Sequence, residues 1–513
     1  KALAWFERAW SIGPSANVLD RLVFALVALG RLEQAYDRVA AALTEQAVAD
    51  LEATQLAGAL HLVWPYWHQG SDLSGLAPDR LAKAMLPVAD GLFQANQGGL
   101  AQEAYEKILL YEASAFVHAR LGHIHRFGGS FSKALGHLQA AVELEPDNAT
   151  YQGLLGNMLL MTGEIEQGLG QLRAAVGHDP GNAELHSSYL FSSHYLPDQD
   201  RLAQFDERRH WGQRHAARSL MFKTPNRDLD PWRRLRIGYL GADFRQHSVG
   251  YTFAGVLTGR NRDEVEVYGY GSVAQADAMT EQFRQLFDVY HDVYSLDDLA
   301  VAHLIERDQV DILVAVAGHS FGHRLKVLAY KPAPIQVDYG AINTLGLEQV
   351  DYRITDCQLD PPESQPFFLE KLVYLPTGYV CYCPPGEISV PGTSPVENNG
   401  FVTFGCFNGA QKTNPRIMEL WGRILRAVPQ SRLLIKCPGG DDAAIRTRFT
   451  DALGQAGVES GRVTVCGLLA QNQHLELYNK VDIALDTYPF NGCVTTLEGL
   501  WMGVPVISLV GPM

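Results

Sequence analysis

In the first half of the chain, apolar residues recur at the spacing that places them on one face of a helix. Between residues 121 and 180 this pattern occurs twice, and one constant offset relates the two copies. The residues that match at this offset are Leu121 with Leu155, Gly122 with Gly156, Gly129 with Gly163, Ala134 with Gly168, Ala141 with Ala175, and Pro146 with Pro180. A period of about 34 residues is typical of the tetratricopeptide (TPR) repeat, in which each copy is a pair of antiparallel helices.

The small residues and the proline of this repeat have physical roles. Small side chains at Gly122, Ala134 and Ala141 allow the two helices of one copy to pack closely. Gly129 permits the tight turn between the helices. Pro146 ends the second helix, because proline cannot continue the hydrogen-bond ladder.

An earlier copy is predicted from Gly30, Ala35 and Ala42, which have the same mutual spacing as Gly129, Ala134 and Ala141. The pattern is degraded between residues 45 and 101, whereas helices continue past Pro180 through residues 184–195. A polar stretch with proline, residues 224–231, closes the array. We therefore assign residues 1–225 to TPR-like helical repeats. Such arrays expose a concave groove, for which we expect protein substrates as partners; a spacer or a surface for homodimer formation is the alternative.

From residue 235 the pattern changes to short apolar runs that end in glycine or polar residues. Strands are predicted at residues 236–240, 265–270 and 310–316, and helices at 275–287 and 297–307. After a loop-rich crossing at 384–399 the alternation restarts. Strands are predicted there at 401–405, 433–436, 463–465, 483–486 and 504–509, and helices at 414–428, 443–456, 474–480 and 495–502.

Alternating strands and helices predict parallel sheets covered by helices on both faces. Two such units separated by a cleft form a GT-B-like pair of Rossmann-type domains. We place the first lobe at residues 226–395 and the second lobe at 396–513. Ligands in open parallel sheets bind at the carboxyl ends of the strands, so the residues just after strands are the candidates for chemistry.

Composition excludes several classes of protein. The 513 residues carry a net charge of −15, which argues against non-specific binding to nucleic acid. The chain contains no run of 18 apolar residues and no signal-peptide pattern, so we expect no membrane association and a cytoplasmic location. The missing first Met predicts that the true N-terminus is absent.

All seven cysteines lie between Cys357 and Cys493. Their odd number and the absence of a CxxC pair predict reduced thiols. Cys381 and Cys383 would share one face of an extended strand, but a pair with no further Cys or His nearby is a weak indication of a metal site. We expect no metal and no cofactor.

Two loops of the second lobe contain candidates for binding a diphosphate. Residues 491–496 join a strand to a helix, where amides at a helix N-terminus and the hydroxyls of Thr495 and Thr496 suit phosphate oxygens. An ordinary helix start, with a glycine turn and Thr as N-cap, is the alternative. Glu498, within the first turn, is a candidate helix cap or a partner of a ribose hydroxyl. Lys412 follows another strand, where its cation would neutralise a leaving diphosphate; by itself this segment fits a solvated surface lysine better.

The first lobe offers histidines at the corresponding places. His247, in the loop 243–247 after the first strand, is a candidate proton acceptor or hydrogen-bond donor to a substrate. A structural role is the alternative, and it is the more common one for a lone histidine. His319 and His323 follow the third predicted strand and have a weaker claim. HExxH, GxSxG, Walker A and zinc-type spacings are all absent from the sequence.

Together these motifs resemble the O-GlcNAc transferase/SPINDLY family of TPR-containing protein glycosyltransferases (glycosyltransferase family 41), and are closer to the SPINDLY branch. The resemblance covers nearly all of residues 235–513. The stretches that carry it are RIGYLGADFRQHSVGYTF at 236–253, residues 311–318, KPAPIQ at 331–336, VDYRITD at 350–356, FVTFGCFNGAQKTNP at 401–415 and DIALDTYPFNGCVTTLEGLWMGVP at 482–505.

The resemblance implies inverting, metal-independent transfer of a sugar from a nucleotide donor to Ser or Thr of proteins. It implies that Lys412 stabilises the leaving diphosphate and that His247 lies at the reacting groups. On the donor side it implies diphosphate contacts from Thr495 and Thr496, a ribose contact from Glu498 and a nucleobase neighbour in His474. The remaining candidates are Asn408 and Gly492 for donor binding, and Asp243, His319 and Gln336 for the cleft between donor and acceptor.

The chain departs from the family pattern in several places. Gln471 replaces a lysine that contacts uracil in the GlcNAc enzymes, Cys493-Val494 replace a His-Thr pair, and DYGAINT at 338–344 replaces a WxGYPxT run. The family also continues beyond the strand that precedes Met513. We therefore expect a truncated second lobe, without activity if the chain is truly cut there.

Three functions remain open from the sequence. A protein O-glycosyltransferase that uses UDP-GlcNAc is the first, and GDP-fucose is a close second donor because of Gln471 and the SPINDLY-like residues. A TPR scaffold with an inactive transferase domain is the alternative of another class, which the presence of Lys412, His247 and both threonines disfavours. Transfer to a small molecule or lipid is disfavoured by the predicted TPR groove.

Overall fold

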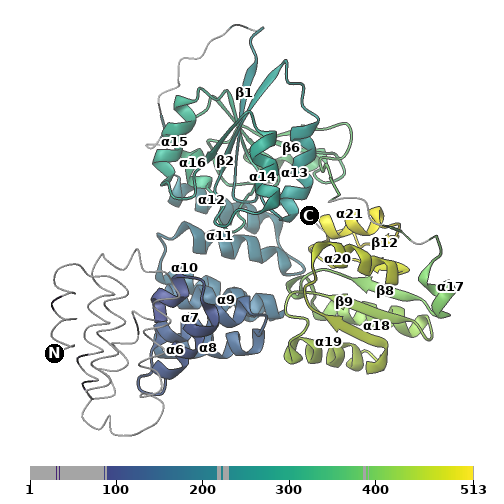
Figure 1. Cartoon of the computed structure of the whole chain (residues 1–513). Coiled ribbons are helices and arrows are strands. Elements are labelled where there is room, and N and C mark those ends of the chain that lie inside the picture. Colours follow the sequence, from purple (N-terminus) through teal and green to yellow (C-terminus); the bar gives the residue numbers. More distant parts are fainter. Residues whose placement is uncertain are drawn as a thin grey trace. The chain divides into compact units, whose positions relative to one another are not determined.

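The computed structural model describes residues 89–216, 221–222, 230, 232–384, 389–390 and 392–511, together with Arg8, Arg31, Gln34 and Leu86 (Figure 1). The predicted early repeat at Gly30, Ala35 and Ala42 lies outside these residues, as do most of 45–101 and of the closing stretch 224–231. The described chain falls into two compact units that divide between Leu155 and Gly156.

The period of the sequence corresponds to helices. The repeat consists of α7 (Ala115–Phe127), α8 (Phe131–Leu144), α9 (Ala149–Thr162) and α10 (Ile165–His178). The starts of α7 and α9 are as far apart along the chain as the starts of α8 and α10, and this separation equals the offset between Gly122 and Gly156. Further helices are α6 (Gly98–Ile108), α11 (Ala183–Ser192), the 3-10 turn η2 (Ser193–Tyr195) and α12 (Arg201–His215).

Gly122 and Gly156 of the repeat lie where the chain has no room for a side chain. A Cβ at Gly122 would lie 2.7 Å from Leu138 Cγ on α8, and a Cβ at Gly156 would lie 2.9 Å from the carbonyl oxygen of Gly168 on α10. The turn residues Gly129 and Gly163 have φ values of +75° and +93°, which glycine adopts without strain. The predicted reasons for these small residues are therefore confirmed.

The first lobe contains a parallel sheet of seven strands in the order β3-β2-β1-β4-β5-β6-β7. Its strands are β1 (Leu235–Gly241), β2 (Val265–Gly271), β3 (Val289–Asp292), β4 (Ile312–Ala315), β5 (Ile335–Asp338), β6 (Tyr352–Thr355) and β7 (Lys371–Tyr374). The order reverses between β1 and β4, whose carboxyl ends therefore border the crevice in which such sheets bind ligands.

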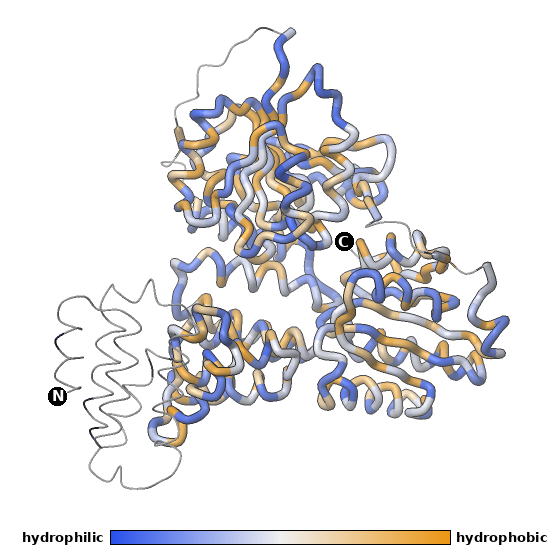
Figure 2. The backbone as a smooth tube through the Cα atoms, in the orientation of Figure 1, coloured by the Kyte–Doolittle hydropathy of each residue, from blue (hydrophilic) through white to orange (hydrophobic). Residues whose placement is uncertain are grey.

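Helices cover both faces of this sheet, as Figure 1 shows. They are α13 (Ser248–Thr258) and α14 (Ala278–Leu286) on one face, and α15 (Asp298–Arg307) and α16 (Leu325–Ala329) on the other. Each face has its own apolar core: Phe253 and Phe283 belong to one, Val301 and Leu328 to the other. Figure 2 shows hydrophobic stretches, in orange, within this lobe.

The second lobe repeats the arrangement with five parallel strands in the order β10-β9-β8-β11-β12. These are β8 (Thr403–Cys406), β9 (Arg432–Lys436), β10 (Val463–Cys466), β11 (Ile483–Leu485) and β12 (Val506–Ile507). Its helices are α18 (Pro415–Ala427), α19 (Ala443–Gln455), α20 (Gln471–Leu477) and α21 (Val494–Trp501), with short 3-10 turns η5 (Ala410–Lys412) and η7 (Tyr478–Lys480). The order reverses between β8 and β11.

The predicted fold class is confirmed: a TPR-like helical array is followed by two Rossmann-type lobes. Strands β3, β5, β6 and β7 were absent from the prediction, and the crossing 384–399 contains the short helix α17 (Pro395–Asn399). Among the described residues, no helix combines the length and the apolar composition that crossing a bilayer requires.

Candidate active site

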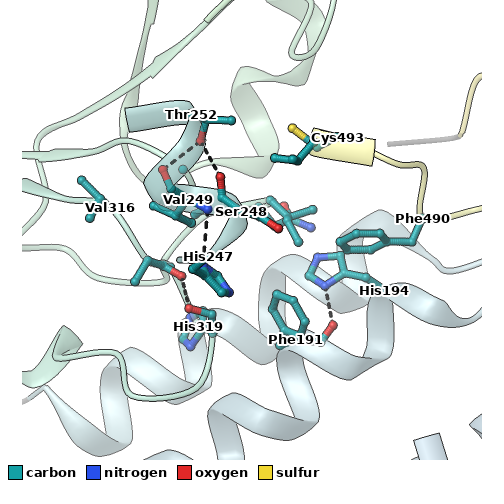
Figure 3. Close-up of a pocket in the computed structure, with 18 of the residues that line it drawn as sticks. Phe191, His194, His247, Ser248, Val249, Thr252, Val316, His319, Phe490 and Cys493 are labelled. Atoms are coloured by element: carbon teal, nitrogen blue, oxygen red, sulfur yellow. Dashed lines mark hydrogen bonds between the residues drawn. The ribbon is translucent and has the colours of Figure 1, made fainter. Parts of the chain in front are cut away.

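A cavity of about 420 Å³ lies where the carboxyl ends of β1, β4, β8 and β11 meet, and helices α11 and α12 form a further wall (Figure 3). Of the residues predicted from the sequence, it brings together His247, His319, Asn408, Lys412 and Thr495. The residues Asp243, Gln336, His474, Gly492, Thr496 and Glu498 are not among those that line it.

Lys412 follows β8, and its ammonium group faces the loop after β11. Its Nζ donates to the carbonyl oxygen of Asn491 at 2.9 Å and lies 4.2 Å from the centre of the Phe490 ring. Burial lowers the pKa of Lys412 to about 8, and the nearby Asp486 carboxylate partly opposes this shift. An anion that enters the cavity would stabilise the charged form of this lysine.

Asp486, the first residue after β11, holds the loop that leads to α21. Its Oδ1 accepts from the backbone N–H groups of Thr487 at 2.8 Å and Gly492 at 2.7 Å, and its Oδ2 accepts from Ser508 Oγ at 2.8 Å. Its Oδ1 also lies 3.5 Å from Asn408 Nδ2. The carboxylate therefore fixes the glycine turn at Gly492 to the end of β8.

The N-terminus of α21 is left open to the cavity. Thr495 Oγ1 donates to Asn408 Oδ1 at 3.1 Å, and Thr496 Oγ1 donates to the carbonyl oxygen of Gly492 at 3.1 Å. The first turn of α21 contains no acidic residue that would compensate the positive end of the helix dipole. Lys412 and this helix end therefore give one wall of the cavity a positive electrostatic character.

Behind α21 lies a buried chain of polar side chains. His474 Nε2 donates to Glu498 Oε2 at 2.9 Å, and His474 Nδ1 accepts from Lys436 Nζ at 3.0 Å. Gln471 Nε2 also donates to Glu498, at 3.3 Å. Burial lowers the pKa of Lys436, whereas the Glu498 carboxylate opposes the shift.

The cap prediction for Glu498 is wrong. The residue lies beyond the first turn of α21, and its carboxylate is engaged by His474 and Gln471 instead of the helix amides. Lys436, which sequence reasoning missed, is the cation at the other end of this chain. Lys436 is the last residue of β9, and this position at the carboxyl end of a strand could have identified it from the sequence.

His247 caps the N-terminus of α13. Its Nδ1 accepts from the Val249 N–H at 3.3 Å, so the proton of the neutral ring lies on Nε2. The same Nδ1 lies 3.3 Å from Asp243 Oδ1. Burial lowers the pKa of His247 and raises the pKa of Asp243, and each group partly opposes the shift of the other. Of the two roles expected for His247, this tautomer fits the hydrogen-bond donor.

His319 lines the cavity, but structural partners engage both of its nitrogens. Its Nε2 donates to the carbonyl oxygen of Leu345 at 3.0 Å, so its Nδ1 accepts from Ser187 Oγ at 2.9 Å. Burial lowers the pKa of this ring well below its usual value. The Trp211 ring packs edge-on against it at 4.9 Å. His319 therefore joins α11 and α12 to the first lobe.

Gln336 and His323 lie away from the cavity, contrary to the expectation that Gln336 faces the cleft. Gln336 is fully buried on β5, where its Nε2 donates to the carbonyl oxygens of Leu328 and Gln349, each at 2.9 Å. His323 is buried beside Trp211. The family resemblance suggested Gln336 and a position after a predicted strand suggested His323, but both side chains are buried in the packing.

The helical wall of the cavity was not predicted. Phe191, His194 and Tyr195 from α11 and η2 contact the Phe490 ring, with ring centres 6.2, 6.1 and 5.4 Å away, and Figure 3 shows His194 beside Phe490. Phe490 in turn lies beneath the Lys412 ammonium group. The last helices of the repeat therefore support the loop that faces Lys412.

A second contact joins the repeat to the Lys412 loop. Arg448 on α19 donates to Thr413 Oγ1 at 3.1 Å, to the Thr413 carbonyl oxygen at 2.9 Å and to the Gly163 carbonyl oxygen at 3.2 Å. A Cβ at Gly163 would clash with this guanidinium group. Thr413 directly follows Lys412, so the turn between α9 and α10 contacts the same loop from below.

No group of three or more His, Cys, Asp or Glu residues suited to a metal ion occurs within the described ranges. The polar groups that line the cavity include Lys412, Arg208, His247 and hydroxyl and amide side chains.

Comparison with known proteins places this geometry in a family. The family described as Glycosyl transferase family 41 matches residues 215–382 and 396–512. The chain is similar to the Arabidopsis thaliana protein named probable UDP-N-acetylglucosamine–peptide N-acetylglucosaminyltransferase SPINDLY, with 40% identity over 313 residues, which are 60% of this chain and 34% of that protein. It is also similar to the Arabidopsis thaliana protein of the same enzyme name designated SEC, with 32% identity over 290 residues, 54% of this chain and 29% of that protein.

Among solved structures, a mutant of the Thermobaculum terrenum O-GlcNAc transferase has the same fold. It superposes with a TM-score of 0.79 and 35% identity, over 85% of this chain and 84% of that one. The chain spans about a third of the length of the plant relatives that it matches.

Proposed function

Since the chain belongs to glycosyl transferase family 41, we propose that it transfers a sugar from a nucleoside diphosphate donor to Ser or Thr hydroxyls of proteins. The names of its relatives describe peptide N-acetylglucosaminyltransferases, and UDP-GlcNAc is therefore the first choice of donor.

One observation carries this proposal: Lys412 and the N-terminus of α21 face one cavity at the strand-order reversal of the second lobe. Departure of a nucleoside diphosphate builds negative charge on its terminal oxygen. A fixed ammonium group and helix-end amides stabilise that charge without rearrangement during the reaction. Transfer by this route requires no metal, because protein groups supply the compensating charge.

The two lobes have separate tasks. The acceptor hydroxyl attacks the anomeric carbon from the first-lobe side, and the bond to the diphosphate breaks on the opposite side, so the configuration inverts. His247 Nε2–H orients an oxygen of the acceptor or of the sugar. Thr495 and Thr496 hold the diphosphate, with Asn408 and Gly492 fixing their loop, whereas the chain of Lys436, His474 and Glu498 supports the nucleoside.

GDP-fucose is the second candidate donor. Gln471 donates to Glu498. It occupies the position at which the GlcNAc enzymes have a lysine that contacts uracil, so this chain has an amide there in place of a cation. Calorimetric titration of the chain with UDP and GDP tests the choice. Tighter binding of UDP supports the first donor, and tighter binding of GDP replaces it by GDP-fucose.

In this proposal the TPR-like helices provide the surface that binds protein partners. Protein substrates bind along the helical array, and the same array serves a homodimer. A cytoplasmic location fits the free cysteines of the chain, because that compartment keeps thiols reduced.

Sugar transfer is tested with isotopically labelled UDP-GlcNAc and GDP-fucose on a library of Ser- and Thr-containing peptides. Mass spectrometry should find labelled peptides with one donor, and K412A should produce none above background. If the chain binds a nucleoside diphosphate but labels no peptide with either donor, a scaffold with an inactive transferase domain is the better description.

A further inference from the structure

Two cysteines beside the cavity have no role in sugar transfer. Cys381 and Cys383 are separated by one residue, and both side chains lie against Gly255 on α13. A Cβ at Gly255 would lie 2.5 Å from Cys381 Sγ and 2.8 Å from Cys383 Sγ. Both sulfurs therefore occupy the small space in front of one glycine.

The backbone holds this pair in place. The Cys383 N–H donates to the carbonyl oxygen of Tyr251 on α13 at 2.8 Å. Cys381 is exposed and Cys383 is half-buried, and both are free thiols. The segment 381–383 thus holds two neighbouring sulfurs against α13, and Cys381 is exposed to solvent.

We propose that Cys381 and Cys383 are a redox modification site that closes reversibly into a disulfide with a low-molecular-weight disulfide such as oxidised glutathione as the oxidant. The Cys381 thiolate attacks one glutathione sulfur, the glutathione S–S bond breaks, and one glutathione thiolate leaves. The Cys383 thiolate then attacks Cys381 Sγ and releases the second glutathione. The protons of the two thiols end on the two glutathione thiolates, so the protein is oxidised by two electrons and the glutathione disulfide is reduced.

The chemistry of the pair sets the order and the reversibility of these steps. Burial and the neighbouring Cys381 raise the pKa of Cys383, so the exposed Cys381 is the first nucleophile. A disulfide that encloses a single residue departs from relaxed geometry, which makes it easily reduced. A strained disulfide of this kind responds to the ratio of reduced to oxidised glutathione, whereas a structural disulfide stays closed.

The same segment forms part of the cavity wall. Tyr379 and Val380 line the cavity, and the Tyr379 carbonyl oxygen accepts from Tyr339 Oη at 2.7 Å. Helix α13, against which the thiols lie, begins directly after His247. Drawing the sulfurs together shifts this segment, so oxidation weakens nucleoside diphosphate binding by about fivefold or more. This regulatory part rests on the proposed function, whereas disulfide formation does not.

The purified chain is equilibrated with glutathione buffers of increasing oxidised fraction, and free thiols are then blocked with N-ethylmaleimide. Mass spectrometry should find a peptide containing Cys381 and Cys383 that has lost two hydrogen atoms and carries no blocking group. Dithiothreitol should restore two blockable thiols. In C383S, glutathione should remain attached to Cys381, because the second thiol is missing.

Two variants serve as controls. C357S removes another exposed thiol and should leave the disulfide unchanged. G255A keeps both cysteines but places a methyl group between their sulfurs, and should lower the fraction of disulfide at each glutathione ratio. Thermal unfolding of G255A shows whether the fold is retained.

Glutathione attached to Cys381 of the unaltered chain, with no internal disulfide at any ratio, would overturn the modification site. A disulfide that leaves UDP and GDP affinity unchanged would overturn the regulatory part alone. A reduced chain that binds neither nucleotide contradicts the sugar-transfer proposal and leaves the thiol chemistry standing.

Discussion

The five strands of the second lobe follow the same order as the first five strands of the first lobe, but the two lobes present different side chains where that order reverses. In the second lobe, Lys412 and the open N-terminus of α21 lie where the strand order reverses. At the first lobe it carries His247 and His319, whose pKa values are both lowered by burial, so both rings are neutral near pH 7. One wall of the cavity is therefore cationic, and the facing wall is uncharged.

This difference teaches how one fold supports two tasks. The parallel sheet fixes where ligands bind, because its strand order creates the crevice. The loops decide the chemistry, because the loop after β8 carries a lysine and the loop after β1 leads to a histidine cap. A leaving diphosphate suits the cationic wall, and a neutral hydroxyl acceptor suits the uncharged one.

Removing the Lys412 ammonium group should abolish most of the charge difference between the two walls of the cavity. We expect K412A to lower kcat by about 100- to 1,000-fold, the range for loss of a group that stabilises developing charge. Quench-flow or steady-state measurement of sugar transfer checks this value. The matched control is K480A, which removes an exposed lysine of the same lobe and should retain full activity. Equal kcat values for K412A and the unaltered chain would contradict the charge assignment.

Changing the uncharged wall should affect transfer without affecting the donor. We expect H247A to lower kcat/KM by about 100-fold while the Kd for nucleoside diphosphate stays the same. H247N keeps a side-chain acceptor for the Val249 N–H and preserves the cap of α13, which is worth about 1 kcal/mol. It should lose activity like H247A; full activity in H247N would show that His247 acts only as a helix cap.

The two walls should also differ in their response to pH. Because the pKa of Lys412 is lowered to about 8, its cation is lost above that pH, and log(kcat/KM) should fall there with a slope of −1. On the acidic side, protonation of His247 removes the Nδ1 acceptor of the Val249 N–H, and activity should fall below the usual histidine pKa. A pH–rate profile checks both limbs, and the alkaline limb should disappear in K412A.

His319 should affect stability instead of chemistry. H319A leaves the Ser187 hydroxyl and the Leu345 carbonyl without their partner, and we expect the unfolding free energy to fall by about 1–3 kcal/mol. Denaturant unfolding measures the loss. The kcat of the folded fraction should stay close to that of the unaltered chain, and a large fall in kcat would instead give His319 a part in the reaction.

Features that depend on neighbouring residues could be predicted from the sequence, whereas those that depend on contacts between distant residues could not. A fixed period predicts the repeat, and alternating strands and helices predict both lobes. Polar loops after apolar strands predict the positions of Lys412, Thr495 and His247. Strands such as β3 and β7 were missed because they lie at the edges of the sheet, where partly exposed side chains break the apolar run. Helix α17 was missed because it is a single short segment within a polar crossing.

The residues missed at the site are those brought there by tertiary structure. Phe191 and Phe490 meet only because the last repeat helices pack against the second lobe, and no periodicity reports such a contact. Gln336 shows the converse error, because the family resemblance suggested a cleft residue whereas its side-chain amide donates to backbone carbonyl groups in the core. The order of strands and loops along the chain predicts which loops meet. The direction in which a side chain points is known only from the tertiary packing.

The most direct test of the cationic wall is the proton uptake that accompanies nucleoside diphosphate binding. Calorimetry at pH 8.5 in buffers of different ionisation enthalpy reports the number of protons bound with UDP or GDP. Lys412 is then largely neutral in the free chain, and the diphosphate should raise its pKa. We predict uptake of a fraction of a proton by the unaltered chain and none by K412A; equal uptake by both, or none by either, would contradict the assignment of Lys412 to the leaving diphosphate.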